Sequence, residues 1–120
     1  MAPAAADLIQ TSLLGEAIDN GPVAVLVADD QMRYVAVNQF ACDWLGYTRE
    51  ELLQLTVNDL APFPETPREY VEVIVGSMQS GTHRLRHRDG HDIPTGFRAG
   101  ATKVAGLTFY IAVFWALDES

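Results

Sequence analysis

The chain has 120 residues, of which 48% are hydrophobic and 20% are charged, and its formal net charge is −8 at pH 7. This length is typical of one domain, and this apolar content excludes intrinsic disorder. Nucleic acid is disfavoured as a partner, because binding to phosphates needs an excess of lysine and arginine. The single cysteine, Cys42, excludes an intrachain disulfide and is interpreted as a small buried hydrophobic residue.

The N-terminal residues and the longest apolar run predict neither a signal peptide nor a membrane-spanning helix. Residues 1–7 lack the basic and apolar regions of a signal peptide. The longest apolar run, residues 109–117, is too short to span a bilayer as a helix. We therefore expect a cytoplasmic domain that makes no membrane contact of its own.

The first predicted element is an amphipathic helix over residues 7–19, with Asp7 as its N-cap. Its apolar stripe recurs at helical spacing and consists of Ile9, Leu13, Leu14, Ala17 and Ile18. Gly21-Pro22 ends this helix. We therefore divide the chain into a cap helix, residues 1–20, and a main domain, residues 21–120.

Two strands and several helices are predicted next. Apolar runs at residues 23–28 and 34–37 flank a turn and predict a hairpin. Asn38 then caps a short helix that ends at Gly46, and Thr48 forms a capping box with Glu51 for a second helix. A longer helix is predicted to begin after Thr66 and to end before Gly81.

The rest of the chain predicts three strands. Residues 82–88 and 92–102 alternate on either side of a tight turn, and residues 107–117 follow a second turn at Ala105-Gly106. Together with the first two strands, they predict an α+β fold with one five-stranded antiparallel sheet and short helices on one face.

The last predicted strand is apolar on both faces. Phe109, Ile111, Val113 and Trp115 alternate with four other apolar residues. One face can pack on the middle helices, but the other would be a bare apolar patch unless something covered it. The first helix is the expected cover, either on its own sheet or on that of a second copy. This predicts a homodimer formed through helix 7–19 and the outer face of the sheet.

Three histidines, His83, His87 and His91, raise the question of a metal site. On an extended strand His83 and His87 are roughly 13 Å apart, which is too far to share one ion. His87 and His91 could meet across the turn, but two imidazoles without a clear third ligand make a weak site. The sequence therefore predicts no metal site. It also shows no nucleophile with a base and no phosphate-binding loop, so we expect a non-catalytic domain.

Four segments, in this order and spacing, resemble the PAS family of sensor domains. They are Gly21-Pro22-Val23, residues 38–52, Arg88-Asp89-Gly90 and Leu117-Asp118, so the resemblance covers about residues 21–118. It implies a pocket between the sheet and the middle helices. It also implies that a ligand or partner is sensed there and relayed through flanking helices of a dimer. The setting would be a sensor histidine kinase, a cyclic-dinucleotide enzyme or a transcription regulator, or a free-standing protein.

Two cofactors known from related domains are disfavoured. Flavin-binding LOV domains carry a reactive cysteine after the second short helix, and the corresponding residues 56–60 contain none. Haem-binding PAS domains usually ligate iron through a histidine of the long middle helix, and residues 67–79 contain none. Covalent flavin and histidine-ligated haem are therefore not expected, and the identity of any ligand stays open.

Helix and strand periodicity select six residues as the expected lining of the pocket. They are Ile74, Met78, Thr95, Phe97, Phe109 and Ile111. The same residues could equally be plain core. Two functions therefore compete: a small-molecule sensor with an accessible cavity, or a ligand-free dimerisation and protein-interaction module with a filled core.

Overall fold

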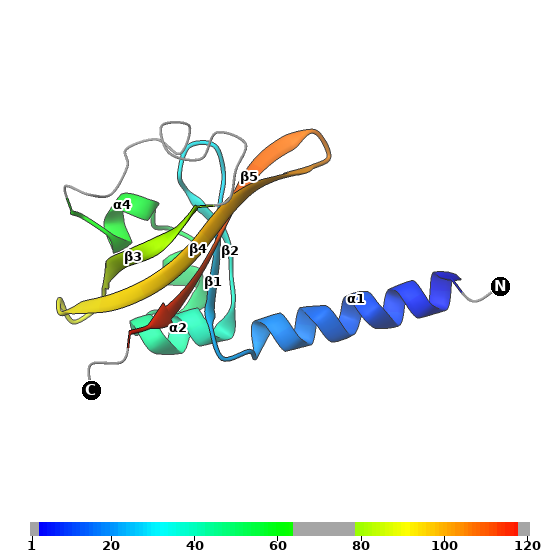
Figure 1. The fold of residues 1–120 in the computed structure, drawn as a ribbon, viewed down its shortest axis with the longest axis horizontal. Helices are drawn as coiled ribbons and strands as arrows, with labels where there is room; N and C mark the ends of the chain where they lie inside the picture. Colours follow the sequence, from blue (N-terminus) through cyan, green and yellow to red (C-terminus); the bar gives the residue numbers. More distant parts are fainter. Residues whose placement is uncertain (1–2, 64–78, 118–120) are drawn as a thin grey trace.

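A computed structural model of the chain describes residues 3–63 and 79–117. In chain order its elements are α1 (Pro3–Asp19), β1 (Ala24–Ala28), β2 (Tyr34–Val37), α2 (Gln39–Leu45), α3 (Arg49–Leu52), α4 (Val57–Leu60), β3 (Gln79–Arg86), β4 (Asp92–Val104) and β5 (Leu107–Ala116) (Figure 1). The predicted helix that begins after Thr66 lies outside the described residues. Within the described ranges, no helix combines the length and apolar character needed to cross a bilayer.

The five strands form one antiparallel sheet in the order β2-β1-β5-β4-β3, which confirms the predicted fold class. The turn between β4 and β5 consists of Ala105 and Gly106, both with positive φ (52° and 79°). Two consecutive left-handed residues match the twist of the flanking strands and fix their pairing. Phe97 therefore lies opposite Phe114, and odd-numbered residues of β4 share a face with even-numbered residues of β5.

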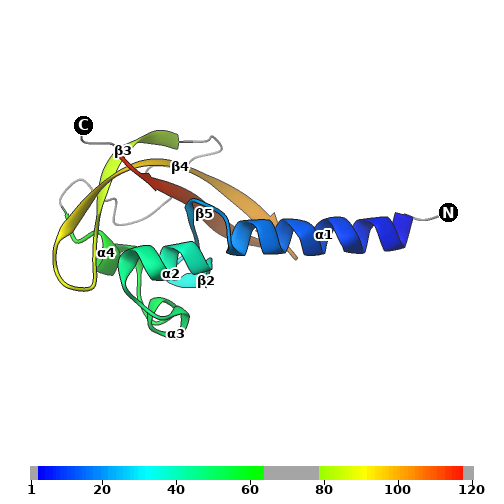
Figure 2. The ribbon, with the colours of Figure 1, turned by 90° about the horizontal axis from the view of Figure 1, so that it is seen from below.

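Helices α2, α3 and α4 lie on one side of the sheet, which we call the inner face (Figure 2). The largest fully buried side chains of the core come from the sheet and from all three helices: Leu26, Leu45, Leu52, Leu60, Leu85 and Thr95. The caps predicted for the short helices are confirmed. Asn38 accepts from the N–H of Ala41, and the reciprocal bonds between Thr48 and Glu51 are both present. These caps satisfy backbone donors that a helix start leaves unpaired.

Helix α1 projects away from the rest of the domain instead of covering its own sheet (Figures 1 and 2). It begins at Pro3, so the prediction that Asp7 caps it is wrong. Proline favours the first helical position and the following alanines are strong helix formers, which extends the helix towards the N-terminus. Leu13, Leu14 and Ile18 are 65%, 52% and 50% exposed. The apolar stripe of α1 therefore lacks cover from the described residues of its own chain.

Candidate functional site

The inner face of the sheet carries a fully buried hydroxyl group at Thr95. Thr95 and Phe97 both point to this face, as the alternation of the strand predicts. Thr95 is 0% exposed, and its Oγ1 has no hydrogen-bond partner among the residues that the structure describes. Because a buried hydroxyl normally has a partner, this atom marks a place where a further group would be stabilising.

A row of rings crosses the sheet beside Thr95. His83 lies opposite Thr95 in the register, and its ring centroid is 6.3 Å from that of Phe97 in an edge-on contact. Phe63 adds a contact with His83 at 6.4 Å, and Phe114 adds one with Phe97 at 6.1 Å. A mostly aromatic wall with a few polar groups, such as the Thr95 hydroxyl, is typical of sites for small organic molecules.

The six residues predicted to line the pocket do not gather in one place. Phe109 and Ile111 lie on the opposite, outer face of the sheet, so the prediction that they share a face with Thr95 and Phe97 is wrong. Both faces of β5 are apolar, so hydrophobicity alone could not decide which one points inwards. The inner residues of β5 are instead Tyr110, Ala112 and Phe114. Ile74 and Met78 lie outside the described residues.

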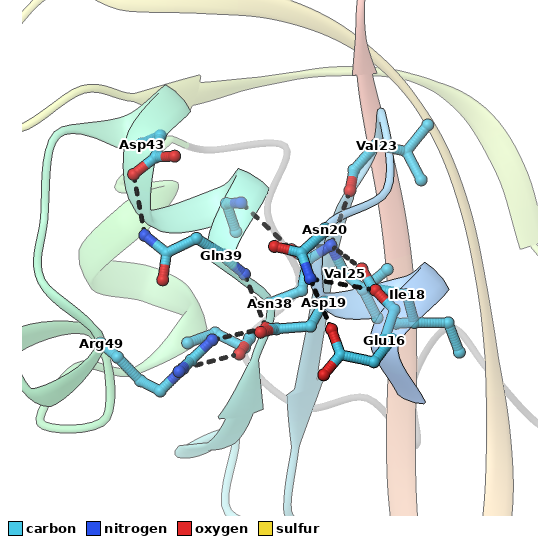
Figure 3. A network of polar contacts seen from close by, with 12 residues as sticks. Glu16, Ile18, Asp19, Asn20, Val23, Val25, Asn38, Gln39, Asp43 and Arg49 are labelled. Carbon is cyan, nitrogen blue, oxygen red and sulfur yellow. Dashed lines mark hydrogen bonds and ion pairs between the residues drawn. The ribbon is translucent and has the colours of Figure 1, made fainter. Parts of the chain in front are cut away.

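Asn38 joins α1 to the domain (Figure 3). Its Nδ2 donates to the carbonyl oxygens of Ile18 at 2.7 Å and of Val23 at 2.8 Å. Its Oδ1 accepts from the backbone N–H of Val25 at 2.9 Å and of Ala41 at 3.1 Å. One side chain, only 4% exposed, thus ties together the end of α1, the start of β1 and the start of α2. The sequence predicted its capping role but not its contact with α1.

A second connection between α1 and the rest of the domain lies at the surface beside Asn38 (Figure 3). Asp19 Oδ1 accepts from the backbone N–H of Gln39 at 3.0 Å and from Arg49 Nη2 at 2.5 Å. Arg49 Nε also donates to the carbonyl oxygen of Val37 at 3.3 Å. Both side chains of the ion pair are more than two-fifths exposed, so its net contribution to stability is small. Its structural effect is to fix the direction in which α1 leaves the domain.

The outer face of the sheet is apolar and hollowed. A hollow of about 360 Å³ lies between α1 and the sheet and includes Ile18, Val25, Val27 and Ile111 in its lining. A second hollow, of about 440 Å³, lies over β4 and β5 beside Arg98 and also reaches Ile111. Ile111 and Trp115 are 37% and 40% exposed. This face therefore offers apolar surface to another molecule.

The turn between β3 and β4 places three potential metal ligands close together. His87 and His91 stack with ring centroids 4.6 Å apart, and the Asp89 carboxylate lies next to both rings. Sequence reasoning paired the two histidines but overlooked Asp89. The spacing His-x-Asp-x-His around a tight turn was the signal that could have identified it.

The one cysteine does not show the features of a reactive thiol. Cys42 is 3% exposed in the core, and burial raises the pKa of its thiol. A thiol that stays protonated is a poor nucleophile and a poor metal ligand. Its placement agrees with its interpretation as a small buried hydrophobic residue.

Comparison with known proteins identifies the architecture. The sequence pattern of the PAS fold matches residues 18–99. The PAS domain of an HTR-like protein from Haloarcula marismortui is 21% identical with a TM-score of 0.80, and the match covers 98% of this chain and 100% of that chain. No curated protein sequence matches the chain.

Two further solved structures have the same fold. A PAS domain from a two-component sensor histidine kinase is 17% identical with a TM-score of 0.78, over 92% of this chain and 99% of that one. The PAS domain of nitrogen regulation protein NR(II) from Vibrio parahaemolyticus is 11% identical with a TM-score of 0.74, over 88% of this chain and 98% of that one.

Proposed function

Because the chain belongs to the PAS fold family, we propose that it is a signalling domain that senses a small molecule on its inner face and relays the event through α1 of a homodimer. The domain itself performs no chemistry in this proposal, and the output lies in another part of the signalling protein. The similar domains from a two-component sensor histidine kinase and a nitrogen regulation protein favour a two-component or other regulatory setting, which we place in the cytoplasm.

The proposal that the domain binds a ligand rests on the buried hydroxyl of Thr95. A buried polar group without a hydrogen bond destabilises the folded state by about 1–3 kcal/mol. A ligand that bonds to Oγ1 would remove this penalty, while the rings of Phe97 and His83 would bury its apolar part. The expected ligand is thus a small, largely apolar or aromatic molecule with at least one polar atom.

The contacts of Asn38 support a relay to α1. β1 contacts β5 along its length, and β5 carries Phe114 on the inner face next to the row of rings. A displacement of β5 would therefore reach Val23 and Val25, to which Asn38 is bonded, and from there Ile18 at the end of α1. This route consists of contacts between neighbouring groups.

Two uncovered apolar surfaces support a dimer. Leu13 and Leu14 of α1 are exposed, and so are Ile111 and Trp115 on the outer face. Because α1 projects away from its own domain, contact between α1 of one copy and the outer face of another is the simplest arrangement that covers both surfaces. Burial of both surfaces would contribute roughly 25 cal/mol for each Å² of apolar area removed from water.

The ligand is tested first on the protein as purified. Native mass spectrometry and the visible spectrum should show a retained molecule as extra mass or colour. If neither is seen, a thermal-shift panel of small metabolites should raise the melting temperature with at least one compound. A protein of apo mass that responds to none of them would support the competing function, a ligand-free dimerisation and protein-interaction module.

The dimer is tested by light scattering at several concentrations. The intact chain should give the mass of two copies, and removal of residues 1–20 should give a monomer. Leu14→Glu should weaken association, whereas Ser12→Glu, a substitution at an exposed polar position of the same helix, should do so much less. A strict monomer at high concentration, both with and without residues 1–20, would contradict the dimer.

A further inference from the structure

The turn between β3 and β4 directs three ligand groups to one point. One ligand atom from each of His87, Asp89 and His91 lies within 4.8 Å of the other two. Oδ1 of Asp89 lies 3.2 Å from Nδ1 of His87 and is in closer contact with Nδ1 of His91. Both imidazoles thus present the same nitrogen to one carboxylate oxygen.

The backbone of the turn holds these groups in place. The N–H of His87 donates to the carbonyl oxygen of His91 at 2.8 Å, and the N–H of Gly90 donates to that of His87 at 2.9 Å. Gly90 has a φ of +100°, a conformation that a residue with a Cβ rarely adopts. The N–H of His91 also donates to Oδ1 of Asp89 at 3.0 Å, which orients the carboxylate. The cluster is therefore assembled by the hairpin itself.

His87 is seated against the corner between α2 and α3. A Cβ on Gly46 would lie 2.6 Å from Cε1 and 2.8 Å from Nε2 of His87, so the ring occupies the space that the missing side chain leaves. The N–H of Asp89 donates to Nδ1 of His87 at 3.1 Å. This bond requires a lone pair on Nδ1. A metal ion bound to Nδ1 would take over that lone pair and replace the hydrogen bond, because an imidazole nitrogen has only one.

We propose that His87, Asp89 and His91 bind one divalent transition-metal ion of the zinc type, through one nitrogen of each imidazole and one carboxylate oxygen. Two imidazoles with a carboxylate suit zinc, nickel and copper, whereas magnesium and calcium prefer oxygen ligands alone. Tetrahedral zinc separates its ligand atoms by about 3.3–3.6 Å. The 3.2 Å between Nδ1 of His87 and Oδ1 of Asp89 is already close to that spacing.

To bind the ion, the His91 ring must also move away from the Asp89 carboxylate. Its side chain is 58% exposed, so the ring can turn and open its close contact with Asp89 as the ion replaces the proton between them. Water would complete the coordination, as in other sites with three protein ligands. The neighbouring cation, Arg88, is paired with Glu51 at 2.7 Å, which offsets its repulsion of the ion. The site does not depend on the sensing function proposed above.

Isothermal titration of the full, untagged chain with zinc chloride tests the site. One ion per chain should bind with a micromolar or tighter dissociation constant, and magnesium and calcium chloride should give no binding. His91→Gln and Asp89→Asn should each weaken zinc binding at least about tenfold, because each removes one of three ligands. His83→Gln removes the one histidine outside the cluster and should leave the affinity within about twofold.

Circular dichroism of each variant separates loss of a ligand from loss of the fold. Both substituted ligands are exposed, so folded variants are expected. As a second readout on the unmodified chain, zinc should shift the imidazole NMR signals of His87 and His91 but not those of His83. Absence of zinc binding at millimolar concentration, or equal affinity in His91→Gln and the wild type, would overturn the proposal.

Discussion

The side-chain amide of Asn38 donates a 2.7 Å hydrogen bond to the carbonyl oxygen of Ile18, the penultimate residue of α1. The same Asn38 side chain also caps α2. A single buried side chain therefore sets the start of one helix and holds the end of another that is 20 positions earlier in the chain. This relationship makes Asn38 the buried connection between α1 and the domain, beside the exposed connection at Asp19.

Asn38→Asp should weaken the attachment of α1 to the domain while it preserves the cap of α2. An aspartate keeps the oxygen that accepts from Val25 and Ala41, but it loses the donors to Ile18 and Val23 and places a carboxylate against their carbonyl oxygens. We expect the free energy of unfolding, measured in urea, to fall by about 1–3 kcal/mol, because the part-buried carbonyl oxygen of Val23 loses the bond from Nδ2. The carbonyl oxygen of Ile18 keeps a bond from the N–H of Gly21 at 3.3 Å.

Asn20→Asp is the matched control for this change. Asn20 directly follows α1, is exposed, and donates through its side-chain amide to the backbone and side chain of Glu16. Its substitution should lower the free energy of unfolding by no more than about 0.5 kcal/mol. Equal effects of the two substitutions would show that Asn38 does not anchor α1.

Thr95→Val should stabilise the ligand-free domain. Valine has nearly the same shape and removes a buried hydroxyl that has no partner among the described residues. We expect the free energy of unfolding to rise by about 1 kcal/mol, and any ligand of the inner face to bind more weakly. Thr82→Val, at an exposed position of β3, should change stability little. A clear loss of stability in Thr95→Val would mean that the hydroxyl already has a partner in the free protein.

Gly46→Ala should destabilise the domain more than Gly90→Ala. Both glycines have positive φ, +83° and +100°, so both substitutions introduce strain of about 1–2 kcal/mol. Only at Gly46 would the new Cβ also meet the His87 ring, at 2.6 Å, whereas nothing lies within 4 Å at Gly90. The expected loss in thermal or urea unfolding is therefore about 2–4 kcal/mol at Gly46. His87→Ala should rescue part of it, and equal losses at the two glycines would contradict this contact.

Local features of the fold were readable from the sequence because they depend on residues a few positions apart. The cap at Asn38, the stop at Gly46 and the capping box of Thr48 with Glu51 are all present where the pattern placed them. Each is set by one side chain and the backbone groups of the next turn. The predicted order of strands and helices rests on local signals of the same kind.

It was harder to predict from the sequence which side chains of β5 point to the inner face, and where α1 lies. Strand β5 is apolar on both faces, so periodicity left Phe109 and Ile111 on the wrong side. The information lay instead in the Ala105-Gly106 turn, whose two left-handed residues fix the register with β4. For α1, exposed leucines indicate that a cover is needed but not which molecule supplies it. Asp89 was missed for a similar reason, since the turn geometry and not the strand spacing brings it to the histidines.

Glu51 predicts a specific dependence of stability on pH. Its carboxylate accepts from the backbone N–H of Thr48 at 2.9 Å and from Arg88 Nη1 at 2.7 Å. The N–H of Thr48, together with the nearby guanidinium, holds the pKa of Glu51 below its ordinary value of 4.5. A depressed pKa in the folded state means that the ionised group contributes stability above pH 4.5. That contribution is lost as the pH falls through the folded-state pKa.

Glu51→Gln removes this dependence and so isolates it. The difference in free energy of unfolding between wild type and Glu51→Gln should be largest near neutral pH and should shrink as the pH falls below 4.5. Glu50→Gln, at the neighbouring exposed position of α3, removes one carboxylate and leaves Glu51 in place, so it is the matched control. Urea unfolding at several pH values measures both. A wild-type advantage over Glu51→Gln that stays constant into the acid range would show that the carboxylate has no charge-dependent role in joining α3 to the β3–β4 turn.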